Sequence, residues 1–409
     1  MSSKLYQEKI IPLEFDMFVG MDVDKLSIAI TVVDHYFFYK AFKIPYDPDA
    51  VVNYMKKHFP KKRIVFAYES GPTGCGLHDR IIKAGYPCLV VASSTVPTAR
   101  GSRVKTNRLD SKKIANSLRG GQLKGIRIPY GNYRALRHLT QLRNVLVKQC
   151  IAYKCRIKAL LLVESIKFPE APAGSQWSKV VLHKLETLKC PQTVRFKLDR
   201  LLESLAFSRV QALKAQKEIR RLCQDDKDLA DSISCLMSLP GIGWILASNL
   251  IARIGDWRLL RNVREIGAFL GLTPRENSTG DDVNEGNITG AGDSIVRNML
   301  IEGSWAAIRK DPELKAFYQR IYNRNPSNIA ARKAIVAVAR KITTRIYRVL
   351  KDRRPYEIRN LVNTKNEMSS EKGRPSASGD DSTLRRTRRY IIKKCSDISY
   401  VPTVGSIAR

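Results

Sequence analysis

The sequence predicts an α/β domain at the amino terminus followed by a mainly helical region, on three observations. Short apolar runs alternate with helical stretches as far as residue 121, and from residue 133 leucines recur at helical spacing through two long segments. Positive charge runs through every segment, and the net charge is +34, from 72 Lys and Arg against 38 Asp and Glu. This predicts salt-sensitive attraction to a polyanion, which nucleic acid fits better than a membrane because no single amphipathic helix collects the basic residues.

The elements of the first domain follow a definite order. We expect strands over residues 17–23, 27–34 and 37–44, and then a helix over 47–59. A strand over 63–70, a helix over 78–85, a strand over 86–93 and a helix over 109–121 that ends at glycine follow. This is the order of an RNase H-like domain, and in open α/β sheets ligands and metals gather where strands end.

Three acidic residues stand at the ends of these elements. Asp22 ends the first strand, Glu69 ends the fourth, and Asp110 opens the last helix. Because these ends converge in an RNase H-like fold, we expect the three carboxylates to bind two Mg²⁺ (or Mn²⁺) ions beside a phosphodiester. Simpler roles stay open, since Asp22 could cap a turn and Asp110 could be a helix N-cap. Glu69, before Ser-Gly-Pro, is harder to explain structurally.

The same helix is surrounded by basic residues that could form a track for phosphate groups. The simpler interpretation is a solvated, charged helix face. The residues of this basic track are Arg100, Arg103, Lys105, Arg108, Lys112 and Lys113.

The region after residue 130 predicts a helical hairpin or coiled coil, which either packs its own core or mediates dimerisation. The first helix carries Leu136, Leu139, Leu142, Leu146 and Val147 and runs towards Ile166, and the second carries Leu198, Leu201, Leu202, Leu205, Val210 and Leu213.

A third block begins near Leu236. Its Gly-Ile-Gly turn is like a helix-hairpin-helix, and Gly241 and Gly243 would offer backbone N–H groups to a phosphate. A glycine-rich loop over residues 269–294 follows, and then helices. Trp244, Trp257 and Trp305 are expected in the core rather than as base-stacking platforms.

The remaining features concern the redox state of the cysteines, the cellular location and the order of the carboxyl-terminal tail. The eight cysteines contain no C-x-x-C pair and are expected to be reduced thiols. We find no apolar stretch of about 18 residues and no signal-peptide pattern, so a cytoplasmic, nucleoid-associated protein is expected. Residues past 351 turn polar, and a disordered tail with a basic cluster is expected.

Six segments, taken together in this order, resemble the IS110 family of insertion-sequence transposases. They are FVGMDVDK (18–25), FAYESGPTG (66–74), RVKTNRLDSKKIA (103–115), SLPGIG (238–243), GLTPRENSTG (271–280) and KAIVAVARKI (333–342), within a resemblance that spans residues 17–353. The resemblance implies a RuvC-like DEDD domain over 15–125 and a serine transposase domain over 233–353. The leucine spacing places a helical linker with possible oligomerisation over 130–232 between them, and the composition places the basic tail over 354–409. The resemblance also implies a DNA transposase or recombinase that mobilises an insertion sequence and is guided by a noncoding RNA of that element.

The acidic tetrad of the family can be placed on this sequence. Asp22, Glu69 and Asp110 match three of its positions, while the third acidic position falls on Asn107. An amide can still ligate a metal through its carbonyl oxygen, but it carries no charge, so the metal affinity should fall or shift.

The family's nucleophilic serine falls in RENSTG, on Ser278 or on Thr279. We favour Ser278, because a primary hydroxyl is the less hindered nucleophile, and Arg275 is the nearest group that could stabilise the developing charge. A turn-forming loop hydroxyl is the simpler role. The family usually has basic residues after the serine and the glycine that follows it, whereas in this sequence Asp281, Asp282 and Glu285 follow.

A serine without a base in its own loop and carboxylates without a nucleophile suggest one composite site, shared across the subunits of a dimer or tetramer. Two alternatives remain. A metal-dependent nuclease resembling a Holliday-junction resolvase would use water instead of serine. A catalytically decayed nucleic-acid-binding protein would retain binding alone, and Asn107 and the acidic loop support it best.

Overall fold

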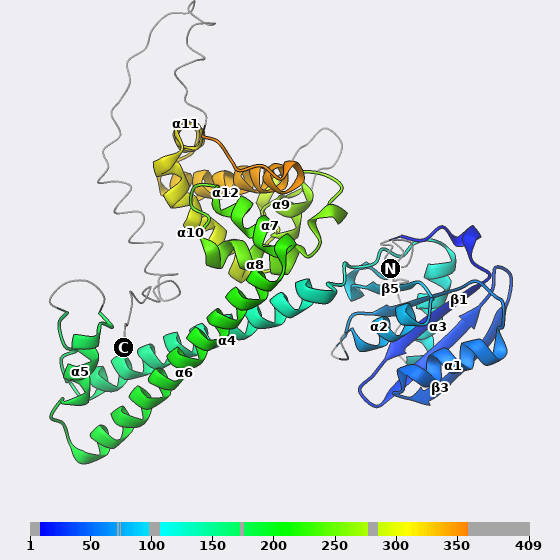
Figure 1. Ribbon diagram of the computed structural model, residues 1–409, viewed down its shortest axis with the longest axis horizontal. Coiled ribbons are helices and arrows are strands. Elements are labelled where there is room, and N and C mark those ends of the chain that lie inside the picture. The colour runs from blue at the N-terminus through cyan, green and yellow to red at the C-terminus, as the bar shows by residue number, and fades with distance from the viewer. Residues whose placement is uncertain are drawn as a thin grey trace, which may run out of the picture. The chain divides into compact units, whose positions relative to one another are not determined.

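The computed structural model describes residues 9–71, 73, 75–97, 107–171, 176–276 and 285–358. The chain divides into two compact units with a boundary between Pro129 and Tyr130, an α/β unit and a helical unit (Figure 1). In the described part, we find no helix with the length and apolar character needed to cross a membrane. The seven cysteines in these ranges are all free thiols.

The α/β unit is built on one five-stranded sheet with the order β3-β2-β1-β4-β5. Strand β2 pairs antiparallel with both β1 and β3, whereas β1 pairs in parallel with β4 and β4 in parallel with β5. Its elements are η2 (Pro12–Glu14), β1 (Met17–Val23), β2 (Ser27–Val33), β3 (Phe38–Pro45), α1 (Pro48–His58), β4 (Ile64–Glu69), α2 (Gly76–Lys83), β5 (Cys88–Val91), η3 (Ser93–Thr95) and α3 (Asn107–Arg119). The predicted order of strands and helices is confirmed.

Strand alternation gives the sheet two buried faces. Met17, Val19 and Met21 of β1 pack into a cluster with α1 and α2, whereas Phe18 packs into a second cluster with α3. Gly20 lies on the α3 side, and a Cβ there would come within 2.3 Å of the backbone nitrogen of Ala115. The glycine therefore allows α3 to lie directly on β1.

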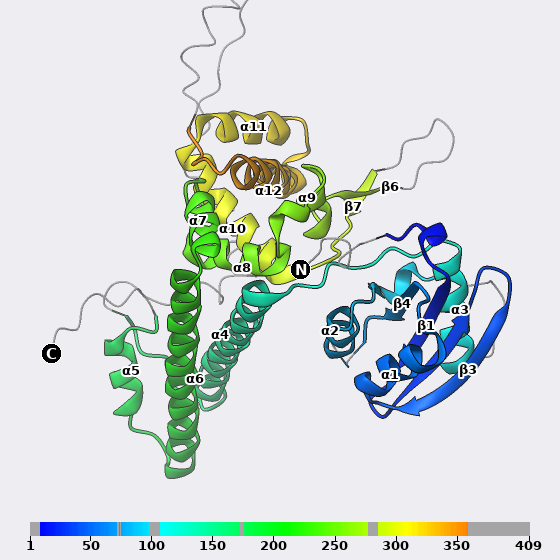
Figure 2. The same ribbon diagram turned by 45° about the vertical axis from the view of Figure 1, so that its right-hand side comes forward.

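The helical unit begins with a long hairpin formed by α4 (Gly131–Val163) and α6 (Gln192–Asp225), which lie side by side (Figure 2). The short helix α5 (Lys179–Glu186) packs near its tip, in a cluster that includes Leu161 and Leu198. The predicted helical hairpin is confirmed.

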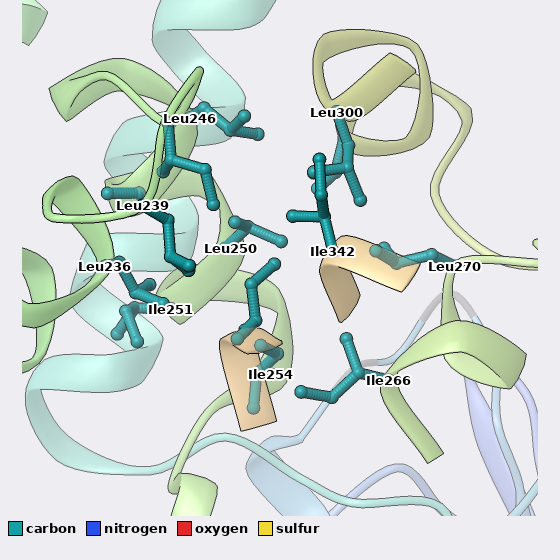
Figure 3. Packing of buried hydrophobic residues seen from close by; sticks show 14 of the residues in the cluster. Leu236, Leu239, Leu246, Leu250, Ile251, Ile254, Ile266, Leu270, Leu300 and Ile342 are labelled. Carbon is teal, nitrogen blue, oxygen red and sulfur yellow. The ribbon is translucent and has the colours of Figure 1, made fainter. Parts of the chain in front are cut away.

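The rest of this unit is a bundle around a large apolar core that includes Leu250, Leu270, Leu300 and Ile342 (Figure 3). Its elements are α7 (Lys227–Met237), α8 (Trp244–Ile254), η4 (Trp257–Leu259), α9 (Glu265–Phe269), β6 (Pro274–Glu276), β7 (Glu285–Ile288), α10 (Ser294–Lys310), α11 (Pro312–Asn323) and α12 (Ser327–Asp352).

The tryptophans and the glycine-rich segment of this bundle differ in part from what the sequence predicts. Trp257 and Trp305 are buried, as predicted, while Trp244 is half-buried with the guanidinium of Arg220 5.1 Å from its ring centre. The glycine-rich segment 269–294 is more than a loop, because β6 and β7 pair in it as a two-stranded antiparallel sheet. The sequence did not predict these short strands, because they lie in a glycine-rich segment and show little alternation of apolar and polar residues.

Candidate active site

Strand register places two of the predicted carboxylates side by side. Strands β1 and β4 run parallel with Met21 opposite Tyr68, so Asp22 and Glu69 occupy the next position on each strand. Both follow the alternation of Phe18 and Gly20, and of Val65 and Ala67, onto the face that α3 covers. Adjacent strands are about 4.8 Å apart, and both side chains are half-buried. The two carboxylates therefore lie next to each other at the end of the sheet where β1 and β4 finish.

The first turn of α3 lies over the same end of β1. The carbonyl oxygen of Ser111 would be 2.3 Å from a Cβ on Gly20, two residues before Asp22. The Ser111 hydroxyl is also 2.9 Å from the Thr31 hydroxyl of β2, and both side chains are buried. Asp110 precedes Ser111 and is half-buried. These contacts hold Asp110 near the strand end that carries Asp22.

Helix α3 begins at Asn107, so Asp110 lies inside its first turn. The N-cap alternative for Asp110 is therefore wrong, because an N-cap residue precedes the first helical residue. A carboxylate in the first turn is still favoured by the helix dipole. Asn107 and Asp110 are three residues apart and so lie on one side of the helix.

A fourth carboxylate, Asp24, touches this group and was missed by the sequence analysis. The side-chain amide of Asn107 donates a hydrogen bond to Asp24 Oδ2 at 2.5 Å, and Asp24 itself is exposed in the β1–β2 turn. The signal was the repeated aspartate in Met-Asp-Val-Asp. This contact gives the amide nitrogen a partner, so the carbonyl oxygen of Asn107 is the atom that could ligate a metal.

The donor set of this edge fits a hard cation. Its atoms are carboxylate and amide oxygens, the ligands that Mg²⁺ and Mn²⁺ prefer. Among the residues that the structure describes, no three Asp, Glu, His or Cys side chains form a closed metal-binding group. An open arrangement is compatible with Mg²⁺, which usually keeps several waters and uses one or two carboxylates together with phosphate oxygens.

The basic track is described only in part. Arg108 and Lys112 are exposed on α3 and Lys113 is half-buried, while Arg100, Arg103 and Lys105 lie outside the described residues. The ammonium group of Lys112 lies 5.4 Å from the ring centre of Phe38 on β3. The exposed part of the track thus extends from the first turn of α3 towards the sheet edge.

The Gly-Ile-Gly turn connects α7 to α8, and its two glycines differ. Gly241 has a φ of +83°, and a Cβ there would be 2.0 Å from the carbonyl oxygen of Gly303 on α10. Close helix packing therefore explains Gly241. Gly243 is the exposed N-cap of α8 and has open space where a Cβ would be, which leaves that end of α8 accessible to an anion.

Both hydroxyls predicted as nucleophile, Ser278 and Thr279, lie outside the described residues, as do Asp281 and Asp282. They belong to the segment between β6 and β7. Arg275 is exposed on β6 and donates to the carbonyl oxygen of Thr289 at 3.3 Å. Arg275 therefore stands at the start of the segment that carries Ser278, held across the hairpin.

The base of this hairpin is held by close backbone packing. A Cβ on Gly271 would be 2.2 Å from the carbonyl oxygen of Ala291, and a Cβ on Gly292 would be 2.0 Å from that of Phe269. Strands β6 and β7 lie between these two contacts in the sequence, so the hairpin that they form starts and ends at closely packed backbone.

Arg297 of α10 adds a side-chain clamp that the sequence analysis missed. Its Nη1 donates to the carbonyl oxygens of Leu270, at 3.0 Å, and Ala291, at 3.1 Å, on the two sides of the hairpin. Arg253 also pairs with Asp293, the N-cap of α10, at 2.6 Å. A lone arginine that binds carbonyls carries no sequence signature, so only the structure identifies it.

Two family models match the chain. A model of the DEDD domain of IS110 transposases, described as a transposase, matches residues 19–164, which include the three predicted carboxylates. A model described as the transposase IS116/IS110/IS902 family matches residues 233–319, which include the Gly-Ile-Gly turn and the β6–β7 hairpin.

Curated relatives are named as transposases as well. The chain is 28% identical to a putative transposase, y4qE, of Sinorhizobium fredii over 83% of both chains. It is 27% identical to the transposase for insertion sequence element IS1328 of Yersinia enterocolitica, over 49% of this chain and 58% of that one. It is 23% identical to the transposase for IS1111A of Coxiella burnetii, over 62% and 68% respectively.

Proposed function

The chain belongs to the IS110/IS116/IS902 family of transposases, and from this premise we propose that it cuts and rejoins DNA with metal-binding carboxylates and a serine nucleophile. Membership in the family implies DNA transposition, and the DEDD domain family is typically metal-dependent. The order of strands in the α/β unit fits an RNase H-like fold of the RuvC-like type. The observation that carries the proposal is the register that sets Asp22 beside Glu69 under the first turn of α3.

In this proposal, the carboxylates of the α/β unit hold Mg²⁺ (or Mn²⁺) beside a phosphodiester. Asp22, Glu69 and Asp110 are the charged ligands, and Asn107 contributes its carbonyl oxygen. A bound ion would stabilise negative charge on the attacking and leaving oxygens. Asp24 holds the amide of Asn107 in orientation through the hydrogen bond to Oδ2.

The serine of the helical unit supplies the nucleophile. Ser278 Oγ attacks phosphorus, an Oγ–P bond forms, and the P–O bond to one sugar breaks. The serine proton leaves, and the released sugar oxygen is protonated. A DNA hydroxyl then attacks the phosphoserine and frees the serine, so the bond energy is conserved for rejoining. Thr279 is the alternative hydroxyl, and Arg275, on β6 before this segment, is the group proposed to stabilise the pentacovalent phosphorus.

The partners in this proposal are DNA, a noncoding guide RNA of the element and further copies of the chain in a dimer or tetramer. The net charge of +34 supports a nucleic-acid partner. Because the carboxylates and Ser278 belong to different units, one composite site could be completed by two subunits. Mixing a Ser278→Ala protein with an Asp22→Ala protein tests this, and no recovery of activity at any ratio would count against sharing.

The chemistry is tested with a labelled DNA that carries the circle junction of the element, Mg²⁺ and RNA transcribed from the element's ends. We expect a denaturation-resistant protein–DNA adduct with the wild type and none with Ser278→Ala or Asp22→Ala. Thr279→Ala should retain the adduct. Asp49→Ala removes an exposed carboxylate of the same α/β unit and should also retain it.

Other outcomes favour the alternatives. Metal-dependent cleavage without an adduct, unchanged in Ser278→Ala, would favour a resolvase-like nuclease that uses water. Tight binding with neither cleavage nor adduct would favour a decayed nucleic-acid-binding protein.

A further inference from the structure

Four consecutive aromatic residues are exposed where β2 turns into β3. Tyr36 is 84% exposed, Phe37 71%, Phe38 47% and Tyr39 61%. We call these four residues the aromatic turn. Leaving four large rings in water forgoes the free energy that their burial would contribute. Exposed aromatic clusters of this size mark interaction sites more often than scattered apolar residues do.

The aromatic turn is held in a fixed conformation. The Asp34 carboxylate accepts hydrogen bonds from the backbone N–H groups of Tyr36, at 2.7 Å, and Phe37, at 2.5 Å. These bonds lower the pKa of Asp34 below its usual value, with the Phe37 N–H as the larger cause. Beneath the turn, His35 Nε2 lies 2.8 Å from the carbonyl oxygen of Phe15, and its ring packs edge-on against Phe18.

Positive charge surrounds these rings. Lys112 of α3 lies 5.4 Å from the ring centre of Phe38, and Arg119 at the end of α3 donates to the carbonyl oxygen of Asp34. Lys40 and Lys43 are exposed on β3 itself. A protein strand added to this sheet edge would have to approach both lysines, which is the feature that protects edge strands from such pairing. A polyanion is attracted by the same groups.

We infer that the aromatic turn binds an unpaired DNA strand, with its rings stacked on bases and the neighbouring basic groups on phosphates. Exposed rings on a turn with a fixed backbone, beside basic groups, are the combination that single-strand binding proteins use. The bases of a duplex are already stacked on one another, so duplex DNA cannot use these rings in the same way. The inference adds a binding site at the opposite end of β1 from the carboxylates.

The choice of DNA over RNA rests on the proposed function. Val33 at the start of the turn pairs with Phe18, four residues before Asp22 on β1. Four residues of strand span about 13 Å, so one unpaired strand could contact the aromatic turn and still reach the carboxylates. Binding measured without metal does not depend on cleavage, and it therefore tests the site even if the chemistry proposed above fails.

The test uses the full chain in EDTA with fluorescein-labelled oligonucleotides of one length: single-stranded oligo(dT), a mixed-sequence DNA duplex and oligo(U). We expect Tyr36→Ala/Phe37→Ala to weaken oligo(dT) binding about tenfold, as the loss of one stacked base would. Duplex binding should change less than twofold. Tyr36→Trp/Phe37→Trp should restore oligo(dT) binding. Phe207→Ala, a control at a similarly exposed ring on α6, should leave binding unchanged.

Three results would overturn the inference. Equal affinities of wild type and double variant for oligo(dT), with both proteins folded by circular dichroism, would exclude stacking at the turn. A loss confined to oligo(U) would assign the surface to RNA. A change in oligomeric state by light scattering, without a change in oligo(dT) affinity, would assign it to a second copy of the chain.

Discussion

Carboxylates serve different purposes in the two units. In the helical unit, Asp311 is buried and accepts hydrogen bonds from Arg345, at 2.6 Å, and from the Tyr356 hydroxyl, at 2.8 Å. In the α/β unit, Glu69 at the end of β4 and Asp110 in the first turn of α3 are half-buried, and neither makes an ion pair with any residue that the structure describes. The difference teaches that a buried carboxylate paired with arginine stabilises the fold, whereas Glu69 and Asp110, the proposed metal ligands, have no such pair among the described residues.

The pKa of Asp311 follows from this pairing. Burial alone would raise it, but the hydrogen bonds from Tyr356 and the backbone N–H of Leu314, together with the charge of Arg345, bring it below the usual value. The Asp311 carboxylate is therefore ionised at neutral pH even though it is buried. Its charge is already satisfied inside the protein, so a metal could bind it only by displacing Arg345.

The largest expected effect separates function from stability at Asp110. Asp110→Asn removes one charge from the proposed metal site, and we expect DNA cleavage to slow by about 10³-fold, because a lost metal contact costs several kcal/mol in the transition state. The thermal unfolding midpoint should stay close to that of the wild type. Cleavage kinetics in Mg²⁺ and calorimetry measure the two quantities. Cleavage at the wild-type rate would remove Asp110 from the site.

The converse is expected at Asp311. Asp311→Ala leaves Arg345 buried without its main partner and should destabilise the helical unit by about 3 kcal/mol, the lower end for a broken buried pair because Glu313 also contacts Arg345. All four tryptophans lie in this unit, so urea unfolding followed by tryptophan fluorescence reports on it alone.

A double variant checks this interpretation of Asp311. Asp311→Leu/Arg345→Met removes both charges and should recover much of the lost stability. If the double variant were less stable than Asp311→Ala, the loss of stability could not be explained by the unpaired charge of Arg345 alone.

A smaller effect is expected at the base of the β6–β7 hairpin. Arg297→Ala removes hydrogen bonds from a charged donor to two carbonyl oxygens and should cost about 1.5–3 kcal/mol. Because the clamp fixes the base of the segment that carries Ser278, adduct formation should slow while single-strand binding in EDTA stays unchanged. Arg309→Ala, at an exposed arginine of the same helix, is the control. Normal adduct formation in Arg297→Ala would show that the glycine contacts alone position the hairpin.

Much of the α/β unit could be predicted from the sequence because its signals are local. Apolar runs set the strands, and the glycine after residue 119 ended the helix that carries Asp110. The adjacency of Asp22 and Glu69 followed from the expected fold, since ends of parallel neighbours meet at one edge. The exact start of α3 did not follow, because the two residues that precede Leu109 in its first turn are polar and carry no apolar periodicity.

What could not be predicted depends on contacts between distant residues. The hydrogen bond between Asn107 and Asp24 joins positions 83 residues apart. The repeated aspartate marks Asp24 as a candidate, but it does not indicate Asn107 as its partner. Gly241 was predicted to offer its backbone N–H to a phosphate, and the close approach of the Gly303 backbone to Gly241 had no signal in the sequence. Three residues of the aromatic turn, Phe37, Phe38 and Tyr39, were included in a predicted strand, and the exposure of their rings depends on β3 being the edge strand of the sheet.

Asn107 offers a test of how charge at the site changes stability and metal affinity. In Asn107→Asp a carboxylate replaces the amide that donates to Asp24, so without metal we expect a loss of about 1 kcal/mol from the broken hydrogen bond and repulsion. Added Mg²⁺ should reverse this loss and bind more tightly than to the wild type. Thermal unfolding with EDTA and with a Mg²⁺ titration measures both effects. A variant that Mg²⁺ does not stabilise would show that position 107 is not a ligand.

The smallest effect concerns a carboxylate of the α/β unit that is paired without being buried. Asp16, before β1, accepts hydrogen bonds from the side chain of Arg63, at 2.9 Å, and from its backbone N–H, at 2.8 Å. The Arg63 side chain is the main cause that lowers the pKa of Asp16 to about 2. A lowered folded-state pKa contributes stability above the unfolded value of 3.8, and this contribution is lost as the pH falls towards 2. Asp16→Asn should therefore be slightly less stable than wild type at pH 7 and equally stable near pH 2, as calorimetry at both pH values would show. A difference that persisted near pH 2 would mean that the backbone hydrogen bond, rather than the charge of Arg63, gives the pair its value.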